Sequence, residues 1–248
     1  MEESNVLVIA LDGLDKDLIE KFSLENLTLS EYGTIDNKTD MSTIKTGELF
    51  ASFITGQNYL KHGIKDKNKW NKPSGYILDR LIPPFLHRNI RGFNRLKRTL
   101  KTLLGLKLEG WSKEDIKSDT LFEEIENSKP LFVPSYNPDI FMEIGASRLP
   151  LKYGYGSDEV PDYYDKYEFS RRKKDLFRNV NTYFDFLMCH FQRPDFHQHF
   201  YGDREVNYEE DRLEEMYKEM DEFAARIIDY FEDNYDVIIF MSDHGLPT

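Results

Sequence analysis

The sequence predicts an α/β fold, a three-layer sandwich in which helices cover both faces of a mostly parallel central sheet. A continuous apolar run at 6–11 and two largely apolar runs at 184–191 and 235–241, all of strand length, alternate with stretches of helical character. Apolar runs without polar alternation are typical of strands buried on both faces, as in parallel sheets. Two of these runs stop at a carboxylate followed by Gly or His-Gly, and in open parallel sheets ligands bind at the carboxyl ends of strands.

The remaining elements are assigned in chain order from periodicity and turn residues. Glu214 and Lys218 give the last helix an i,i+4 charge pair, and Gly56 fits as the residue that ends the second helix. The expected elements are helices at 15–22, 46–55, 170–183 and 208–233, a short strand at 130–134, and a Tyr/Gly/Asp-rich loop at 153–167.

One stretch differs from the rest in composition. Residues 80–107 contain eight Lys or Arg and no Asp or Glu. We expect a small inserted cap of basic helices at about 70–125, within an otherwise single domain that covers 1–248. Three interpretations of the basic stretch stay open: a solvated cap face, a wall that recognises phosphate, or an interfacial helix that contacts an anionic membrane surface.

Bulk properties exclude some function classes. The chain has 248 residues, a hydrophobic fraction of 40% and a formal net charge of -12, so binding of DNA or RNA by bulk attraction is not expected. Cys189 is the single cysteine, which rules out an intrachain disulfide and fits a reducing compartment. The apolar run 6–11 is too short for a signal peptide. The expected location is therefore cytoplasmic.

Candidate ligands for a metal follow the predicted strands. Asp12 comes directly after the first strand, and Asp243-His244 follows the last one. A third group, Asp195 to His199, follows the middle strand. Carboxylate and imidazole together suit Zn²⁺, with Mn²⁺ as an alternative.

The sequence resembles the type I phosphodiesterase and nucleotide pyrophosphatase family of the alkaline phosphatase superfamily. Thr46 is followed ten residues later by the end of a Thr-Gly pair at 55–56, and His-Gly-Ile at 62–64 begins six residues beyond that, which matches the family's nucleophile segment. Leu11-Asp12-Gly13, Pro194-Asp195 through His199, and Ser242 through Gly245 are similar to its ligand motifs, in the family's order.

The resemblance implies a fold, an activity and a role for each of these residues. The fold would be alkaline-phosphatase-like, and the activity would be metal-dependent hydrolysis of phosphodiester or pyrophosphate bonds. Thr46 would attack phosphorus and form a covalent phospho-threonine. The substrate would be a phosphorylated small molecule: a nucleotide, a nucleotide sugar or a lipid-linked phosphate. Of two divalent cations, one would be held by Asp12, Thr46, Asp243 and His244, and the other by Asp195 and His199.

The chain departs from the family pattern at two places. Glu48 stands where the family usually has Pro, two residues after the nucleophile. The family also takes a third ligand for its second metal from a His downstream of the Asp-His motif, and no His follows His244. The expectation is a C-terminally incomplete domain, or a site that is incomplete or completed by another group. His197 is a candidate substitute, although a helix would aim it differently from His199.

Other interpretations stand beside these assignments. Taken alone, Thr46 reads as a helix cap and Asp12 as a turn residue. His62 is expected to pack the loop after its helix, and His190 and His87 are expected to be ordinary core or surface histidines. A phosphomonoesterase, a sulfatase or a phosphotransferase of the same superfamily is the alternative enzyme. The non-enzyme alternative is a metal-poor homologue that binds a phosphorylated ligand or a partner.

Overall fold

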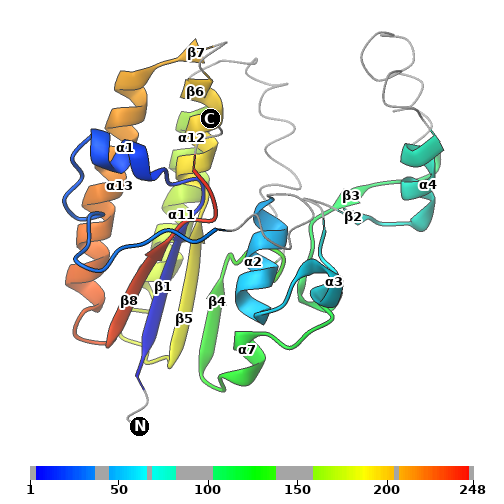
Figure 1. The fold of residues 1–248 in the computed structure, drawn as a ribbon, viewed down its shortest axis with the longest axis horizontal. Helices are drawn as coiled ribbons and strands as arrows, with labels where there is room; N and C mark the ends of the chain where they lie inside the picture. Colours follow the sequence, from blue (N-terminus) through cyan, green and yellow to red (C-terminus); the bar gives the residue numbers. More distant parts are fainter. Residues whose placement is uncertain are drawn as a thin grey trace.

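The fold is built on one parallel sheet. The computed structural model describes residues 4–36, 45–65, 69–81, 103–137, 159–203 and 207–245. In these residues the largest sheet has four strands in the order β4-β5-β1-β8, and every neighbouring pair is parallel. The strands are β4 (Ser128–Leu131), β5 (Phe186–Phe191), β1 (Val6–Leu11) and β8 (Val237–Met241). The predicted α/β class with a parallel sheet is confirmed (Figure 1).

The strands differ in how deeply they are buried. Every residue of β5 is buried, and in β1 only Val6 is partly exposed. The prediction of a third fully buried strand was wrong for β8, where Val237 is 41% and Ile239 40% exposed. β8 pairs only with β1 among the described strands, so it forms one edge of this sheet and is not enclosed on both sides.

One face of the sheet carries most of the helices. They include α1 (Lys16–Lys21), α11 (Ser170–Phe177), α12 (Arg193–Tyr201) and α13 (Glu210–Phe231) (Figure 1). In α13 the buried side chains recur at helical spacing, from Leu213 through Met220 and Ile227 to Phe231, which gives the helix a continuous apolar stripe. The predicted ion pair of Glu214 and Lys218 lies on its outer side, at 2.6 Å.

The opposite face is covered by α2 (Thr46–Thr55) and α7 (Leu121–Glu124), which pack Phe50, Ile54 and Phe122 against the sheet. Apolar cores therefore lie on both faces of the sheet, which confirms the three-layer arrangement. The short helix α3 (Tyr59–His62) follows α2 after Gly56, which ends α2 in a left-handed conformation as predicted.

The segment expected to form an inserted cap projects away from the sheet (Figure 1). Its described part is a two-stranded antiparallel ribbon, β2 (Lys69–Trp70) with β3 (Leu108–Glu109), and the helix α4 (Pro73–Leu81). Residues 82–102, most of the basic stretch, lie outside the described residues. By 121–124 the chain has returned to the sheet as α7.

Several predicted boundaries were wrong for local reasons. The expected loop at 153–167 is helical from Glu159 on, as α10 (Glu159–Tyr164) and a π-helical turn η2 (Asp165–Phe169), while 153–158 lie outside the described residues. Here Val160, Tyr164 and Phe169 are buried, so Tyr164 belongs to the core, whereas Tyr167 is 52% exposed. The strand predicted at 130–134 is β4, which begins two residues earlier and ends three residues earlier. It ends at Leu131 because Phe132 takes a positive φ of 60°.

The helix predicted at 170–183 ends at Phe177. The remaining small elements are a 3₁₀ turn η1 (Lys113–Asp115) and a ribbon of β6 (Gly202–Asp203) with β7 (Asn207–Tyr208). Within the described ranges, no helix is both long enough and apolar enough to span a bilayer.

Candidate metal centre

Two neighbouring strands deliver acidic side chains to one edge of the sheet. Asp12 follows β1 directly, and its N–H donates to the carbonyl of Phe191 at 2.9 Å, so the parallel pairing with β5 continues to this residue. Asp243 comes two residues after β8. The N–H of Gly13 lies 3.4 Å from Oδ1 of Asp243, which joins the two chain segments beyond the strand ends.

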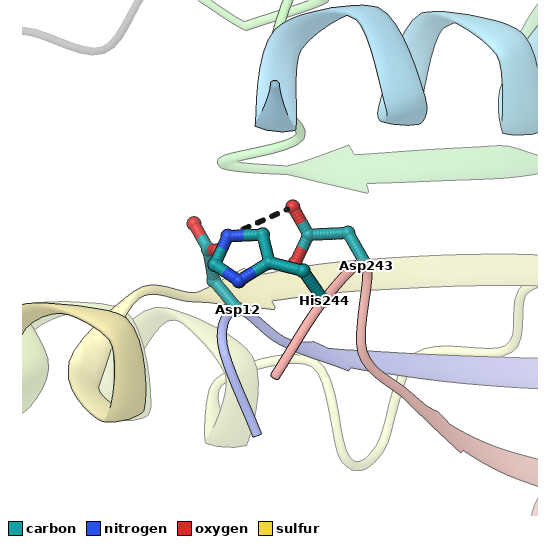
Figure 2. A group of neighbouring side chains, drawn as sticks. All are labelled: Asp12, Asp243 and His244. Carbon is teal, nitrogen blue, oxygen red and sulfur yellow. Dashed lines mark ion pairs between the residues drawn. The ribbon is translucent and has the colours of Figure 1, made fainter. Parts of the chain in front are cut away.

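Asp12, Asp243 and His244 form a compact group of potential ligands (Figure 2). One ligand atom from each lies within 4.8 Å of the others. Nε2 of His244 is 3.3 Å from Oδ1 of Asp12 and 3.7 Å from Oδ2 of Asp243. Asp12 is fully buried and Asp243 is 6% exposed.

The chemistry of this group fits a divalent cation. Two buried carboxylates in contact are unfavourable unless positive charge compensates them. Oδ1 of Asp12 is buried and has no hydrogen-bond donor in the described part of the chain, although it faces His244. Two carboxylates and an imidazole are a donor set typical of Zn²⁺ and acceptable to Mn²⁺.

Asp195 and His199 lie beside this group. The N–H of Asp195, in the first turn of α12, donates to the carbonyl of Asp12 at 2.8 Å. Oδ1 of Asp195 is 3.8 Å from Nε2 of His244 and 3.3 Å from Nε2 of His199. Asp195 therefore lies between the group of Asp12, Asp243 and His244 on one side and His199 on the other. The His199 side chain is 69% exposed.

His197 belongs to another environment. It is buried, and its Nε2 lies 3.1 Å from Oδ1 of Asp165. As the sequence indicated, the helix directs His197 differently from His199. The His197 side chain contacts Asp165 and not the group of Asp12, Asp243 and His244.

The close approach of β1 and α12 requires glycine at position 13. Gly13 has a φ of +75°, and a Cβ there would lie 2.7 Å from Cα of Asp195. We expect Gly13→Ala to lower the free energy of unfolding by about 1–3 kcal/mol and to displace Asp195 from Asp12. Gly56→Ala is the matched control, since Gly56 also has a positive φ but a Cβ added there would have no neighbouring atom within 4 Å. Urea denaturation of both variants checks this, and equal losses would contradict it.

Thr46 begins helix α2 at the same edge of the sheet. The structure contradicts its interpretation as a helix cap, because the N-cap residue is Lys45 and Thr46 is already helical. The carbonyl of Gly47 accepts a hydrogen bond from Ser135 at 3.0 Å, just beyond the carboxyl end of β4. Phe50, one turn further, packs edge-on against His190 at 4.9 Å between ring centroids. The positive end of the α2 dipole therefore lies at the carboxyl edge of the sheet, where anions are favoured.

Glu48 and His62 are both fully buried behind this helix start. Nδ1 of His62 accepts from the N–H of Ile64 at 3.1 Å, and Nε2 lies 3.0 Å from Oγ of Ser52. Burial lowers the pKa of His62, and the charge of Glu48 offsets this only in part. His62 thus connects the loop that follows α2 to Ser52 of that helix, which is the structural role expected for it. The Glu48 side chain lies inside the protein.

The residue that sequence reasoning missed is His190. It was expected to be an ordinary histidine, but its Nε2 lies 3.3 Å from Oδ2 of Asp12. The signal is the strand register: His190 pairs with Ala10, two residues before Asp12 on β1, and alternate residues of a strand share a face. This register is not visible until the strand order is known.

The group of Asp12, Asp243 and His244 is expected to release protons when it binds a metal ion. Burial and the charge of Asp12 raise the pKa of Asp243 to about 7. Burial acts against protonated His244, but its close contact with Asp12 and the charge of Asp243 raise its pKa to about 10. Both side chains must lose protons to act as ligands.

We therefore expect the apparent affinity for Zn²⁺ to rise between pH 6 and 8, by about tenfold per pH unit for each proton released. Titration calorimetry in buffers of different ionisation enthalpy counts these protons. An affinity that does not change with pH would contradict the expected proton release.

Comparison with known proteins gives a family and a fold. The sequence matches the family "type I phosphodiesterase / nucleotide pyrophosphatase" over residues 6–248. No curated protein matches it. A solved structure of murine ectonucleotide pyrophosphatase/phosphodiesterase 5, an inactive variant in complex with AMP, has a TM-score of 0.54 and 12% identity, over 98% of this chain and 57% of that one.

A second structure of that murine protein has a TM-score of 0.52 and 12% identity, over 97% of this chain and 57% of that one. At this identity the likeness concerns the fold. The chain spans 57% of the length of each of these two structures.

Proposed function

This chain belongs to the type I phosphodiesterase/nucleotide pyrophosphatase family, and we propose that it is a metal-dependent hydrolase of phosphodiester or pyrophosphate bonds. The observation that carries the proposal is the buried group of Asp12, Asp243 and His244 at the carboxyl edge of the sheet, the edge at which α2 also begins. A site of this composition, at the edge of the sheet where a helix N-terminus favours anions, suits a phosphate ester.

Each residue has a role in the proposed reaction. Asp12, Asp243 and His244 would hold one divalent cation, and Asp195 and His199 would contribute to a second. Bound cations would lower the pKa of coordinated oxygens and neutralise charge on the phosphate. Thr46 is the nucleophile: its hydroxyl oxygen attacks phosphorus, the ester oxygen departs, and the resulting phospho-threonine is hydrolysed by water.

Helix α2 would assist this step through its position. The N-terminus of α2 lies at the carboxyl edge of the sheet, and the N–H groups at a helix N-terminus suit the oxygens of a phosphate. Burial of Glu48 supports the proposal as well, because a carboxylate two residues from the nucleophile would otherwise repel an anionic substrate.

We propose a nucleotide or a related phosphorylated small molecule as substrate. The family to which the chain belongs and the AMP complex of a protein with the same fold support this choice. A nucleotide sugar and a lipid-linked phosphate contain the same kind of phosphate ester or pyrophosphate bond. They are the alternative substrates, and they differ from a nucleotide in the groups attached to the phosphate.

Hydrolysis of bis(p-nitrophenyl) phosphate and p-nitrophenyl phosphate tests the proposal, with chelator-treated protein before and after addition of Zn²⁺ or Mn²⁺. We expect metal-dependent turnover with the higher kcat/KM for the diester. Preference for the monoester would favour a phosphomonoesterase. If neither substrate is turned over with either metal, the hydrolase proposal fails and the non-enzyme alternative gains support.

A further inference from the structure

A buried chain of polar groups leads from η2 to the candidate metal centre. Arg172 is 1% exposed, and its Nε donates to Oε1 of Glu168 at 2.7 Å. Its Nη1 donates to the carbonyl of His190 at 3.0 Å and lies 3.1 Å from Nδ1 of the same histidine. Nε2 of His190 then reaches Oδ2 of Asp12 at 3.3 Å.

The guanidinium of Arg172 decides which nitrogen of His190 carries the proton. A guanidinium only donates hydrogen bonds, so Nδ1 of His190 must be the acceptor. A proton on Nδ1 would face an N–H of Arg172 across 3.1 Å. The imidazole proton therefore sits on Nε2, where it points at a carboxylate oxygen able to accept it.

Because of this hydrogen bond, the two carboxylate oxygens of Asp12 have different contacts. Oδ2 accepts from His190, whereas Oδ1 faces Nε2 of His244 at 3.3 Å. A carboxylate held in this way presents one oxygen in a fixed direction. In metal sites, groups that orient the ligands contribute about 10–100-fold in metal affinity.

Glu168 and the ring of Phe50 hold the chain in place. Glu168 is 5% exposed and compensates the charge of Arg172, and it is also bound by Arg171 at 2.7 Å. Phe50 packs edge-on against the imidazole of His190 from α2. The ring of His190 is therefore fixed by contacts from two elements outside its own strand.

We propose that His190, fixed by Arg172, is a positioning residue that holds Asp12 so that its Oδ1 faces the cation. The inference rests on the proposed function, because it assigns a role toward the metal that the function requires. His190 does not touch substrate and is not itself a ligand in this proposal.

His197 provides a matched control for a test of His190. Both histidines are buried, at 6% and 2% exposure, and both have Nε2 close to an aspartate oxygen, at 3.1 Å and 3.3 Å. The partner of His197 is Asp165, which lies outside the acidic group. Replacement of either histidine removes a comparable interaction, but only His190 contacts a proposed ligand.

Zn²⁺ affinity is measured by chelator competition for the wild type, His190→Phe, His190→Gln and His197→Phe, and folding is checked by thermal denaturation. We expect His190→Phe to weaken binding by about 10–100-fold and His197→Phe to leave it within about threefold. His190→Gln should recover part of the loss, because its amide accepts from Arg172 and donates to Asp12. Wild-type affinity in a folded His190→Phe variant would overturn the proposal.

The tautomer is measured separately in metal-free protein labelled with ¹⁵N at histidine. Two-bond ¹H–¹⁵N correlations should show the proton of His190 on Nε2. A proton on Nδ1 would overturn the hydrogen-bond chain whether or not the protein binds metal. The wild type could also show the expected tautomer of His190 and yet bind no divalent cation. That result would count against the proposed function, although the hydrogen bonds between Arg172, His190 and Asp12 would be confirmed.

Discussion

Replacement of Thr46 by alanine is expected to lower kcat for phosphodiester hydrolysis by about 10³-fold or more, because in the proposed reaction this residue supplies the attacking oxygen. The fold should be unaffected, since Thr46 is half-buried and is not the cap of α2. The loss should therefore appear in steady-state kinetics of bis(p-nitrophenyl) phosphate, with the thermal midpoint close to that of the wild type. Thr46→Ser keeps a hydroxyl at the same place and should retain much of the activity.

Thr55 gives a control on the same helix. Its Oγ1 donates to the carbonyl of Ala51 at 2.7 Å, at the end of α2 away from the acidic group. Thr55→Ala should therefore leave kcat close to the wild-type value. If Thr46→Ala turns the diester over as fast as Thr55→Ala does, Thr46 is not the nucleophile, although the fold and the metal site would stand.

Replacement of Asp243 by asparagine is expected to change metal binding and stability in opposite directions. Asn keeps the size and an acceptor for the N–H of Gly13, but it removes one of the proposed anionic ligands. We expect Zn²⁺ affinity to fall by about 100-fold or more, with a matching loss of metal-dependent activity at limiting metal.

The metal-free variant should be more stable than the metal-free wild type. Burial and the charge of Asp12 raise the pKa of Asp243 to about 7. Ionised Asp243 therefore penalises the folded state, and the penalty grows from about pH 4 and is complete above pH 7. Asp243→Asn removes it, so we expect a gain of about 1–3 kcal/mol at pH 8 and no gain at pH 4.

Denaturation of the metal-free proteins at both pH values measures this difference. Asp236→Asn is the control, since Asp236 lies at the opposite, exposed end of the same strand and accepts from the N–H of Asn5. A variant at Asp243 that keeps wild-type Zn²⁺ affinity would remove this residue from the site. Loss of stability at pH 8 would show that the two carboxylates do not repel in the way described.

The sequence was sufficient to predict the parts of the fold that rest on local pattern. The apolar run at 6–11 is a strand with the predicted bounds, and α2 begins and ends where spacing and Gly56 placed it. The meeting of Asp12 with Asp243 and His244 followed from the rule that parallel strands bring their carboxyl ends to one edge. The structure places these three side chains within contact distance.

What the sequence did not reveal depends on tertiary neighbours. The position of His190 beside Asp12 follows from strand register, which a single sequence does not display. The exposure of β8 follows from its place at the edge of the sheet and not from its composition. The helical stretch from Glu159 was predicted as a loop because it is rich in Tyr and Asp, and only the structure shows that Tyr164 is buried in the core.

The central claim is that the group formed by Asp12, Asp243 and His244 holds a divalent cation. Anomalous diffraction at the zinc absorption edge, from crystals grown or soaked with Zn²⁺, tests it directly. A strong anomalous peak within coordination distance of all three side chains is the predicted result. Crystals with zinc bound elsewhere but no peak between these side chains would contradict it.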